Sequence, residues 1–192
     1  AELIEGIVYM PSPVSDEHGQ MERRVSTWLG VYQAATRGVV GENNTTSFIL
    51  DGTPQPDLNL RLLPEYGGGS WVEEHYIQGA PELLVEVCAS SASYDLHKKY
   101  NLYQSAGVPE YLALVVYERE IRWHVLSDGH YQLRSPGTDG LHRSPIFPGL
   151  WLDGPALFAG DLRRVLDCLQ DGLNSGEHQE FVAKLAAKAG RQ

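Results

Sequence analysis

One carboxylate stands inside a run of residues that has the pattern of a buried strand. In the segment 82–88, "ELLVEVC", Glu86 is flanked so closely by Leu84, Val85 and Val87 that either face of the strand places it beside apolar neighbours. A short apolar run of this kind is typical of a strand buried on both faces. An unpaired charge in such a place costs several kcal/mol, or the group takes up a proton. Glu86 therefore needs a partner, which the fold has to supply.

The elements around this strand predict a mixed α/β domain built on one sheet. Alternating apolar residues indicate strands, and apolar residues at i, i+3 and i+4 spacing indicate helices. In chain order, the expected elements are a hairpin or bulged strand over 2–10 with a turn at Glu5-Gly6, a helix over about 17–36 capped by Ser15, strands at 38–40 and 45–50 joined through Asn43-Asn44, a strand from Asp57, the strand 82–88, a helix over about 94–106, strands within 107–118, 119–127 and 129–134, and helices from Pro155 onward. This order is neither a regular βαβ repeat nor a sandwich.

The segment 64–81 differs from its surroundings in composition. It is rich in glycine and proline and has no clear period, so we expect a mobile excursion from the core.

Composition and charge limit the possible functions. The 192 residues, of which 42% are hydrophobic and 21% charged, are typical of one globular domain. Lys and Arg total 15 against 25 Asp and Glu, a formal net charge of −10. This balance opposes non-specific attachment to nucleic acid, because that attachment comes from neutralised phosphates. A local basic patch, or a divalent cation at an acidic site, could still overcome it.

Cellular location is indicated by what the sequence lacks. Cys88 and Cys168 lie far apart and show no spacing typical of a disulfide framework or a zinc ribbon, so a reducing cytoplasm is expected. No apolar run is long enough to span a membrane, and the N-terminus lacks the features of a signal peptide. Because the chain opens within a strand and without an initiator Met, we expect the physiological start to lie upstream.

Three groups of polar residues could carry chemistry. Asp57 stands at the head of a strand, and Glu86 lies inside the apolar one. Asp95 and Lys99 are spaced i, i+4 on the helix that follows, with Tyr103 one turn further on the same face. Two carboxylates on neighbouring strands would repel each other unless a cation sits between them. Mg²⁺ suits such a site, because proteins bind it through one or two carboxylates together with water and phosphate oxygens.

Four sequence blocks resemble the Uma family of bacterial restriction-endonuclease-like proteins. They are "ELIEGIVYMPSPVSDEHG" at 2–19, "PQPD" at 54–57, "GAPELLVEV" at 79–87 and "YDLHKKYNLYQSAGVPEYL" at 94–112. The blocks agree with the family in order, spacing and residue type. The resemblance implies the PD-(D/E)XK nuclease fold, an α+β core with a central mixed sheet flanked by helices. It also implies extra N-terminal strands and C-terminal helices, in a single domain over 1–192 with a core at about 17–132 and a helical extension at about 155–190.

The resemblance also assigns roles to individual residues. It makes Asp57 and Glu86 metal-binding carboxylates, with the backbone carbonyl of Val87 as a further ligand. In the general nuclease pattern a lysine stands two residues after the second carboxylate, where this chain has Cys88. The Uma-type pattern places a lysine on the following helix, and Lys99 matches that position.

Four supporting positions follow from the same resemblance. Asp95 and Tyr103 match the positions that neighbour the helix lysine. Glu2 and His18 correspond to polar positions of the N-terminal block that approach the site. The implied activity is hydrolysis of DNA phosphodiester bonds by an endonuclease that uses Mg²⁺, or Mn²⁺ in its place. A homodimer is expected, because two symmetric sites suit the two strands of a duplex.

Structural roles remain open for each of these residues on sequence grounds. Asp57 could be a turn residue after the proline-rich loop, and Asp95 and Lys99 an exposed helical ion pair. His18 could hydrogen-bond locally at a helix end, and Tyr103 could be a core aromatic. For Glu86 the alternative is a structural ion pair with Arg61 or Lys98.

Two other functions remain open beside the nuclease. One is an inactive or repurposed member of the fold that binds a partner, which the acidic balance and the Cys88 position favour. The other is a metal-dependent hydrolase of a small phosphoester.

Overall fold

The computed structural model describes residues 1–10, 13–89 and 94–190, and for residues 94–96 it describes the backbone alone. Its elements are β1 (Glu2–Ile4), β2 (Ile7–Tyr9), α1 (Asp16–Ala35), β3 (Val39–Val40), β4 (Ser47–Phe48), β5 (Leu58–Leu62), a 3₁₀ turn (Pro64–Tyr66), β6 (Trp71–Glu73), β7 (Tyr76–Gln78), β8 (Leu83–Cys88), α2 (Tyr94–Ser105), β9 (Glu110–Val115), β10 (Glu120–Ser127), β11 (His130–Leu133), β12 (Leu141–Arg143), β13 (Trp151–Asp153), α3 (Gly154–Ala159), α4 (Leu162–Leu173) and α5 (Gly176–Ala189).

A six-stranded mixed sheet forms the centre of the fold. Its strand order is β11-β10-β9-β8-β5-β3. The pair β8 and β9 is parallel, and the other neighbours are antiparallel. A parallel pair needs a crossover connection, and helix α2 supplies it. The central strands are apolar on both faces because both faces are covered, as the pattern around Glu86 predicts.

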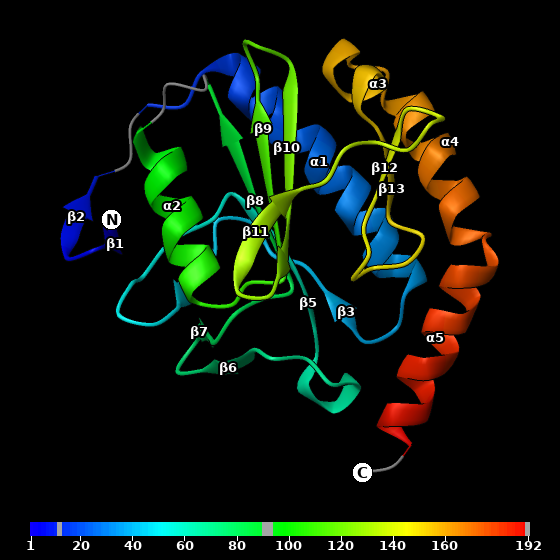
Figure 1. Ribbon diagram of the computed structural model, residues 1–192, viewed down its shortest axis with the longest axis horizontal. Coiled ribbons are helices and arrows are strands. Elements are labelled where there is room, and N and C mark those ends of the chain that lie inside the picture. Colours follow the sequence, from blue (N-terminus) through cyan, green and yellow to red (C-terminus); the bar gives the residue numbers. More distant parts are fainter. Residues whose placement is uncertain (11–12, 90–93, 191–192) are drawn as a thin grey trace.

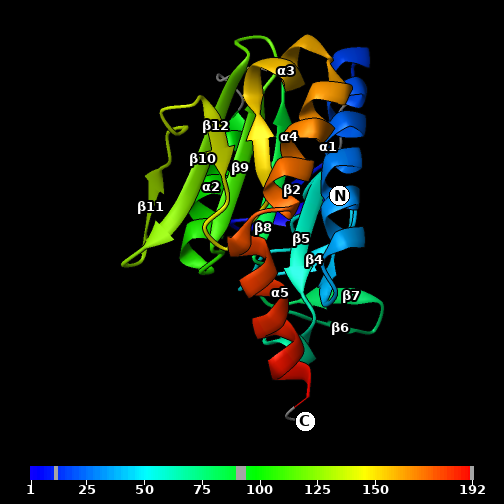
Figure 2. The ribbon, with the colours of Figure 1, turned by 90° about the vertical axis from the view of Figure 1, so that its right-hand side faces the viewer.

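Helices cover the two faces of this sheet unequally. Figure 1 shows α1, α4 and α5 on one side and α2 on the other. The view in Figure 2 looks onto the side covered by α4 and α5. The larger core lies on this side, where Trp28 and Tyr32 of α1 are fully buried among residues of β5, β8 and β9. The smaller core lies under α2 and contains Leu84, Tyr103 and Tyr111.

Helix α1 begins where the sequence predicts. The Ser15 side chain accepts a hydrogen bond from the His18 amide at 3.3 Å, which satisfies one of the free amides at the helix start. The apolar stripe of Met21, Val25 and Trp28 faces the sheet. This N-cap fixes His18 in the first turn, and the site described below uses that position.

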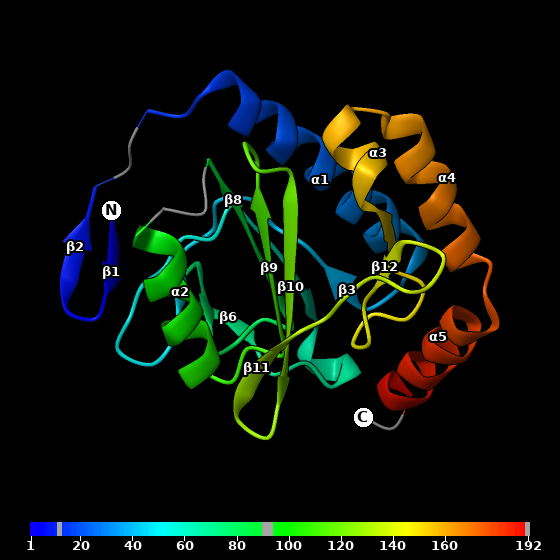
Figure 3. The ribbon, with the colours of Figure 1, turned by 45° about the horizontal axis from the view of Figure 1, so that its top comes forward.

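The N-terminal hairpin lies beside α2 (Figure 3). Glu5 and Gly6 both have positive φ, at 50° and 75°, which is the conformation of a two-residue hairpin turn. The prediction of a turn at Glu5-Gly6 is therefore confirmed. Leu3 of the hairpin forms an antiparallel β-bridge with Thr53, which holds the neighbouring Glu2 close to that part of the chain.

The middle of the chain has the predicted strands and one hairpin that the sequence did not predict. Strands β3 and β4 fall within the expected ranges 38–40 and 45–50, with Asn43-Asn44 between them, and β3 pairs with β5 and β4 with β7. The segment 64–81 contains β6 and β7, which form a small sheet with β4 in the order β4-β7-β6. Its turn is made by Glu74 and His75 at φ 48° and 73°. The sequence hides this hairpin because neither turn residue is Gly or Asn.

The terminal region has the predicted helices and one addition. Helices α3, α4 and α5 occupy the tail as expected, and the short strands β12 and β13 pair ahead of them. Within the described ranges, no helix combines the length and apolarity needed to cross a membrane.

Another carboxylate of the sheet, that of Glu110, is buried and held by hydrogen bonds. Glu110, at the start of β9, has no exposed surface, and the Ser144 hydroxyl donates to it at 2.8 Å. Burial raises the pKa of Glu110 to about 7, against the hydrogen bonds from Ser144 and the Ile146 amide. This residue ties β9 to the loop before β13.

Candidate active site

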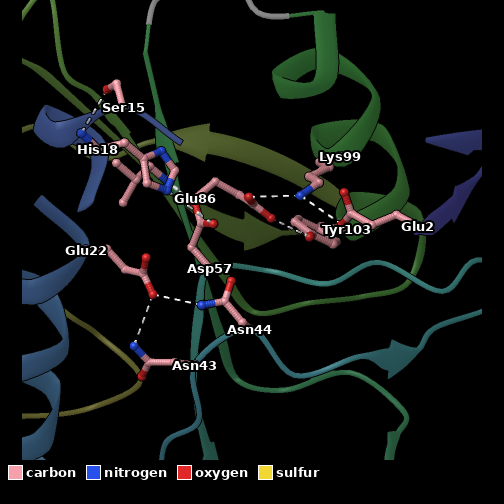
Figure 4. A network of polar contacts seen from close by, with 11 residues as sticks. Glu2, Ser15, His18, Glu22, Asn43, Asn44, Asp57, Glu86, Lys99 and Tyr103 are labelled. Carbon is pink, nitrogen blue, oxygen red and sulfur yellow. Dashed lines mark hydrogen bonds and ion pairs between the residues drawn. The ribbon is translucent and has the colours of Figure 1, made fainter. Parts of the chain in front are cut away.

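Asp57 and Glu86 come together at one end of the sheet. Strands β5 and β8 are antiparallel neighbours, so the start of β5 lies beside the end of β8, with Leu58 opposite Val85. Asp57 Oδ2 accepts a hydrogen bond from the Val87 amide at 2.7 Å. Figure 4 shows Asp57 and Glu86 next to each other, facing the same space. The strand register therefore produces the pair of carboxylates that the sequence predicted on neighbouring strands.

The partner of Glu86 is on helix α2. Lys99 Nζ donates to Glu86 Oε2 at 2.9 Å, and the Tyr103 hydroxyl donates to Oε1 at 2.8 Å. All three side chains are buried: Glu86 is 5% exposed, Lys99 7% and Tyr103 0%. Lys99 and Tyr103 are four residues apart, so one face of α2 presents both to the same carboxylate.

The alternative partners proposed for Glu86 are engaged elsewhere. Arg61 binds Glu42, with 2.8 Å between Nη2 and Oε1. Lys98 donates to the Tyr9 hydroxyl and lies over the Tyr9 ring. The reading of Asp95 and Lys99 as an exposed ion pair is also wrong for Lys99, which is buried. The Asp95 side chain lies outside the described residues.

Burial and charge set the protonation of this cluster. Burial raises the pKa of Glu86 to about 7, although Lys99 opposes the shift and Asp57 adds to it. Burial alone would lower the pKa of Lys99, but the charges of Glu86 and Glu2 outweigh it, and the net pKa lies above the usual value. Lys99 therefore stays an ammonium ion at neutral pH, held between carboxylates.

Glu2 reaches the site from the N-terminal hairpin. Its Oε1 lies 3.0 Å from Lys99 Nζ and also accepts a hydrogen bond from the backbone amide of Gln55 at 2.6 Å. Figure 4 shows Lys99 between Glu2 and Glu86. Glu2 therefore lies beside the helix lysine, where the resemblance places it.

His18 approaches Asp57 from the first turn of α1. Its Nε2 lies 3.6 Å from Asp57 Oδ1, which is ion-pair range and too long for a direct hydrogen bond. The contact with Asp57 raises the pKa of His18 above its usual value, against the effect of burial. The backbone amide of His18 bonds locally to Ser15, whereas its side chain faces Asp57 on another element.

Further polar residues adjoin Asp57 that the sequence did not single out. Glu22 Oε1 accepts from the side-chain amides of Asn43 and Asn44 at 3.3 and 2.8 Å. The Asn44 backbone amide donates to the Asp57 carbonyl at 3.0 Å. One signal was present: Glu22 stands four residues after His18, hence on the same helix face.

A cavity of about 260 Å³ opens at this place. It is lined by residues of the N-terminus, the loop before β5 and α2: Ala1, Glu2, Val14, Asn44, Gln55, Asp57 and Lys99. The cavity gives solvent and small solutes access to Asp57 and to the Lys99 ammonium.

The carbonyl of Val87 also faces the site. The Cys88 carbonyl accepts from the Val116 amide at 2.8 Å, so even-numbered residues of β8 bond towards β9. Backbone polar groups alternate sides along a strand, so the Val87 carbonyl points towards β5. Val85 pairs with Leu58, the first residue of β5, so Val87 lies past the start of that strand, next to Asp57. Cys88, at the position of the pattern lysine, is partly exposed.

Side-chain ligands for a metal are few. Among the described residues no group of three or more His, Cys, Asp or Glu side chains is arranged to hold a metal ion. Two carboxylates with a backbone carbonyl are a different donor set, made of oxygen atoms alone, which is the type that Mg²⁺ prefers.

This fold and site define a restriction-endonuclease-like domain: a mixed sheet with two carboxylates at one end and a lysine from the crossover helix. The sequence matches the model of the Uma2 family, described as "Putative restriction endonuclease", over residues 1–154, and the chain belongs to that family. No curated protein matches the sequence.

A solved structure shares the fold. It is the crystal structure of a putative nuclease belonging to DUF820 from Anabaena variabilis, which matches with a TM-score of 0.69 at 16% sequence identity. The match covers 83% of this chain and 89% of that one. The expected fold class is confirmed.

Proposed function

We propose that this protein is a Mg²⁺-dependent endonuclease that hydrolyses phosphodiester bonds of DNA. One observation carries the proposal: Lys99 Nζ lies 2.9 Å from Glu86 Oε2, on the strand next to Asp57. Two carboxylates and an ammonium ion beside an open cavity are the groups that phosphodiester hydrolysis needs. The Uma2 family, with its endonuclease description, supports the same reading.

The residues present fit a hard divalent cation. Asp57, Glu86 and the Val87 carbonyl would hold it. Glu86 accepts one hydrogen bond at each oxygen, and a carboxylate oxygen has two lone pairs, so each keeps one for a metal. When bound, Mg²⁺ or Mn²⁺ would supply a water of lowered pKa and a contact for a phosphate oxygen.

The remaining steps belong to residues of the chain. Lys99 offsets negative charge that develops on the phosphate, and it is already an ammonium ion on a largely buried side chain, where such charge stabilisation is strong. Tyr103 and Lys99 orient the Glu86 carboxylate through both its oxygens. His18, beside Asp57, is placed to accept or return a proton at the mouth of the site.

The proposal also specifies which phosphoester the protein hydrolyses. The net charge of −10 and the small cavity of about 260 Å³ favour a second candidate, a hydrolase of a small phosphoester. DNA is preferred because the family description names an endonuclease. We further propose that the protein acts as a homodimer, which size-exclusion chromatography with light scattering tests directly.

A cleavage assay tests the proposal. Purified protein is incubated with supercoiled plasmid, linear duplex, single-stranded DNA and bis-p-nitrophenyl phosphate, in Mg²⁺, Mn²⁺ or EDTA. We expect metal-dependent cleavage of DNA that is lost in Asp57→Asn, Glu86→Gln and Lys99→Met. Asp167→Asn, an exposed carboxylate on α4, is the matched control and should keep full activity. Absence of cleavage in the wild type, or equal cleavage by the site variants, would contradict the proposal.

A further inference from the structure

A second cavity lies under helix α2, on the same face of the sheet as Glu86. Its volume is about 260 Å³, and it is lined by His97, Tyr100, Tyr111, Arg122 and His124. These residues come from α2, β9 and β10. None of them takes part in the polar network around Asp57 and Glu86, and the proposed hydrolysis makes no use of them.

Aromatic rings form the walls of this cavity. The Tyr111 and His124 rings are nearly parallel, with centroids 5.9 Å apart and an interplanar angle of 16°. Tyr100 stands at 85° to His124, with its centroid at 5.0 Å. Walls of this kind suit a flat aromatic ligand, because nucleobases stack on Tyr and His side chains.

Two buried polar atoms of the residues that form the walls lack a hydrogen-bond partner among the described residues. Tyr111 is fully buried, and neither its hydroxyl nor Nδ1 of His124 forms a hydrogen bond within the described part of the chain. Other buried tyrosines of the protein are satisfied: the Tyr131 hydroxyl donates to the Val108 carbonyl and that of Tyr103 to Glu86. A buried hydroxyl without a partner is unfavourable, so a ligand that forms a hydrogen bond with it gains affinity.

The protonation state of these groups favours a ligand with hydrogen-bond acceptors. Burial raises the pKa of Tyr111 well above the usual value, with Glu86 adding to the shift, so the hydroxyl keeps its proton. Burial lowers the pKa of His124, which stays neutral. The Tyr111 hydroxyl can therefore donate to a carbonyl oxygen or a ring nitrogen.

The cavity adjoins the candidate active site. The Tyr103 ring, whose hydroxyl binds Glu86, lies with its centroid 5.3 Å from that of Tyr111. The register places Glu86 opposite Ala113 and Ala113 opposite Arg122, so Arg122 is two strands from Glu86 along one row. At about 4.8 Å per strand, their backbones are roughly 10 Å apart. A nucleotide close to the scissile phosphate could reach across this distance.

One guanidinium stands at the rim of the cavity. Arg122 is partly exposed to solvent and forms an ion pair with Glu120 at 2.8 Å. The chain as a whole carries a net charge of −10, but the Arg122 guanidinium lies beside the aromatic cavity, where it can bind the phosphate attached to a base.

We propose that the cavity formed by His97, Tyr100, Tyr111, Arg122 and His124 binds a nucleobase, with the attached phosphate near Arg122. The proposal deepens the nuclease function and rests on it for the source of the base, a nucleotide of the substrate strand near the cleaved bond. The volume lies below the roughly 300–1,000 Å³ of cavities for drug-sized ligands, so one base fits and a longer segment does not.

Fluorescence of 2-aminopurine tests this assignment. A short single strand with one central 2-aminopurine is titrated with the full chain in EDTA, which separates binding from cleavage. We expect quenching and a measurable Kd. Tyr111→Phe should weaken binding about fivefold through loss of the hydroxyl, and Tyr100→Ala about tenfold or more through loss of stacking. Tyr117→Phe, an exposed tyrosine outside the cavity, should leave the Kd within about twofold.

Three further arms decide the interpretation. An unlabelled strand with an abasic site at the position of the 2-aminopurine should compete with the labelled strand more weakly than the intact unlabelled strand does, and competition by free nucleoside monophosphates shows whether a base binds without its strand. Arg122→Gln, a partly exposed position, should weaken binding to the strand without unfolding the chain. Unquenched probe, equal binding of the abasic strand, or unchanged Kd values in the cavity variants would overturn the assignment. Base binding without metal-dependent cleavage would instead overturn the nuclease function and leave the base site standing.

Discussion

Lys99 Nζ donates to Glu86 Oε2 at 2.9 Å, although the two residues lie on different elements, α2 and β8. The lysine expected two residues after the second carboxylate is replaced by Cys88, and the crossover helix supplies a cation at the same carboxylate. A lysine on the strand would have its position set by the sheet itself. The position of Lys99 is instead set by the way helix α2 packs on the sheet, so the site depends on that packing.

Replacing Lys99 by Met should abolish activity and destabilise the fold. Removal of a charge-stabilising group from an active site typically lowers kcat by about 100-fold or more. Removing one member of a buried ion pair costs about 3 kcal/mol, because Glu86 is left without a cation. Cleavage assays and urea unfolding measure the two effects. Lys184→Met, at an exposed position on α5, is the control, and the double variant Lys99→Met with Glu86→Gln should regain stability without activity.

Divalent cations should stabilise the protein through Asp57. At a Mg²⁺ concentration tenfold above Kd, the gain in unfolding free energy is about 1.4 kcal/mol. The melting temperature should therefore rise in Mg²⁺ and Mn²⁺ and return to its starting value in EDTA. Asp57→Asn should remove the rise, whereas Asp167→Asn should keep it. An equal rise in both variants would show that the cations act elsewhere.

Tyr103→Phe should produce a milder defect than the Lys99 variant. The change removes one hydrogen bond to the Glu86 carboxylate and leaves the ring in the core. A hydrogen bond to a charged group contributes about 1.5–3 kcal/mol, which sets the expected loss of stability. Activity should fall about tenfold, because Glu86 keeps Lys99 as a partner. Equal stability of Tyr103→Phe and Tyr117→Phe would contradict this assignment.

Glu110 should make stability depend on pH. Its pKa rises from 4.5 to about 7 on folding, so between these values the folded state holds more protons than the unfolded chain. The contribution is fully present below about pH 4.5 and is lost as pH rises through 7, a change of about 3 kcal/mol.

Glu110→Gln should flatten this dependence and raise stability at pH 8. Glu86 has a pKa of about 7 as well, so the difference between wild type and variant, measured by urea unfolding from pH 5 to 8.5, isolates the Glu110 share. Glu180→Gln, at an exposed position, serves as the control. Parallel curves for the wild type and Glu110→Gln would disprove the titration of Glu110.

Much of the fold follows from local sequence patterns. The N-cap at Ser15, the turn at Glu5-Gly6 and the strand 82–88 rest on short-range rules, and the structure has all three. The hairpin at Glu74-His75 could not be predicted in this way. The positive φ of Glu74 is imposed by the pairing of β6 with β7 and of β7 with β4, since a glutamate rarely adopts it otherwise.

The sequence predicts which residues belong to the candidate site better than it predicts which of them are in contact. The need of Glu86 for a partner follows from its apolar neighbours, whereas the choice of Lys99 over Arg61 or Lys98 depends on how α2 crosses the sheet. Arg61 lies on β5 and forms an ion pair with Glu42. The only sequence signal for Glu22 was its position four residues after His18, and the Tyr111 cavity had none, because it depends on tertiary packing between elements distant in the chain.

The site is formed by residues of five separate segments, namely the N-terminal hairpin, α1, the residue before β5, β8 and α2, which contribute Glu2, His18, Asp57, Glu86 and Lys99. No partly folded chain can assemble it, because the parallel pair β8–β9 and the docking of α2 and of the hairpin must all be complete first. Parallel pairing with a crossover is a slow step in folding, since loop closure precedes the contacts that reward it. During refolding, recovery of catalysis should therefore coincide with the last kinetic phase, well after the helical signal of circular dichroism has returned.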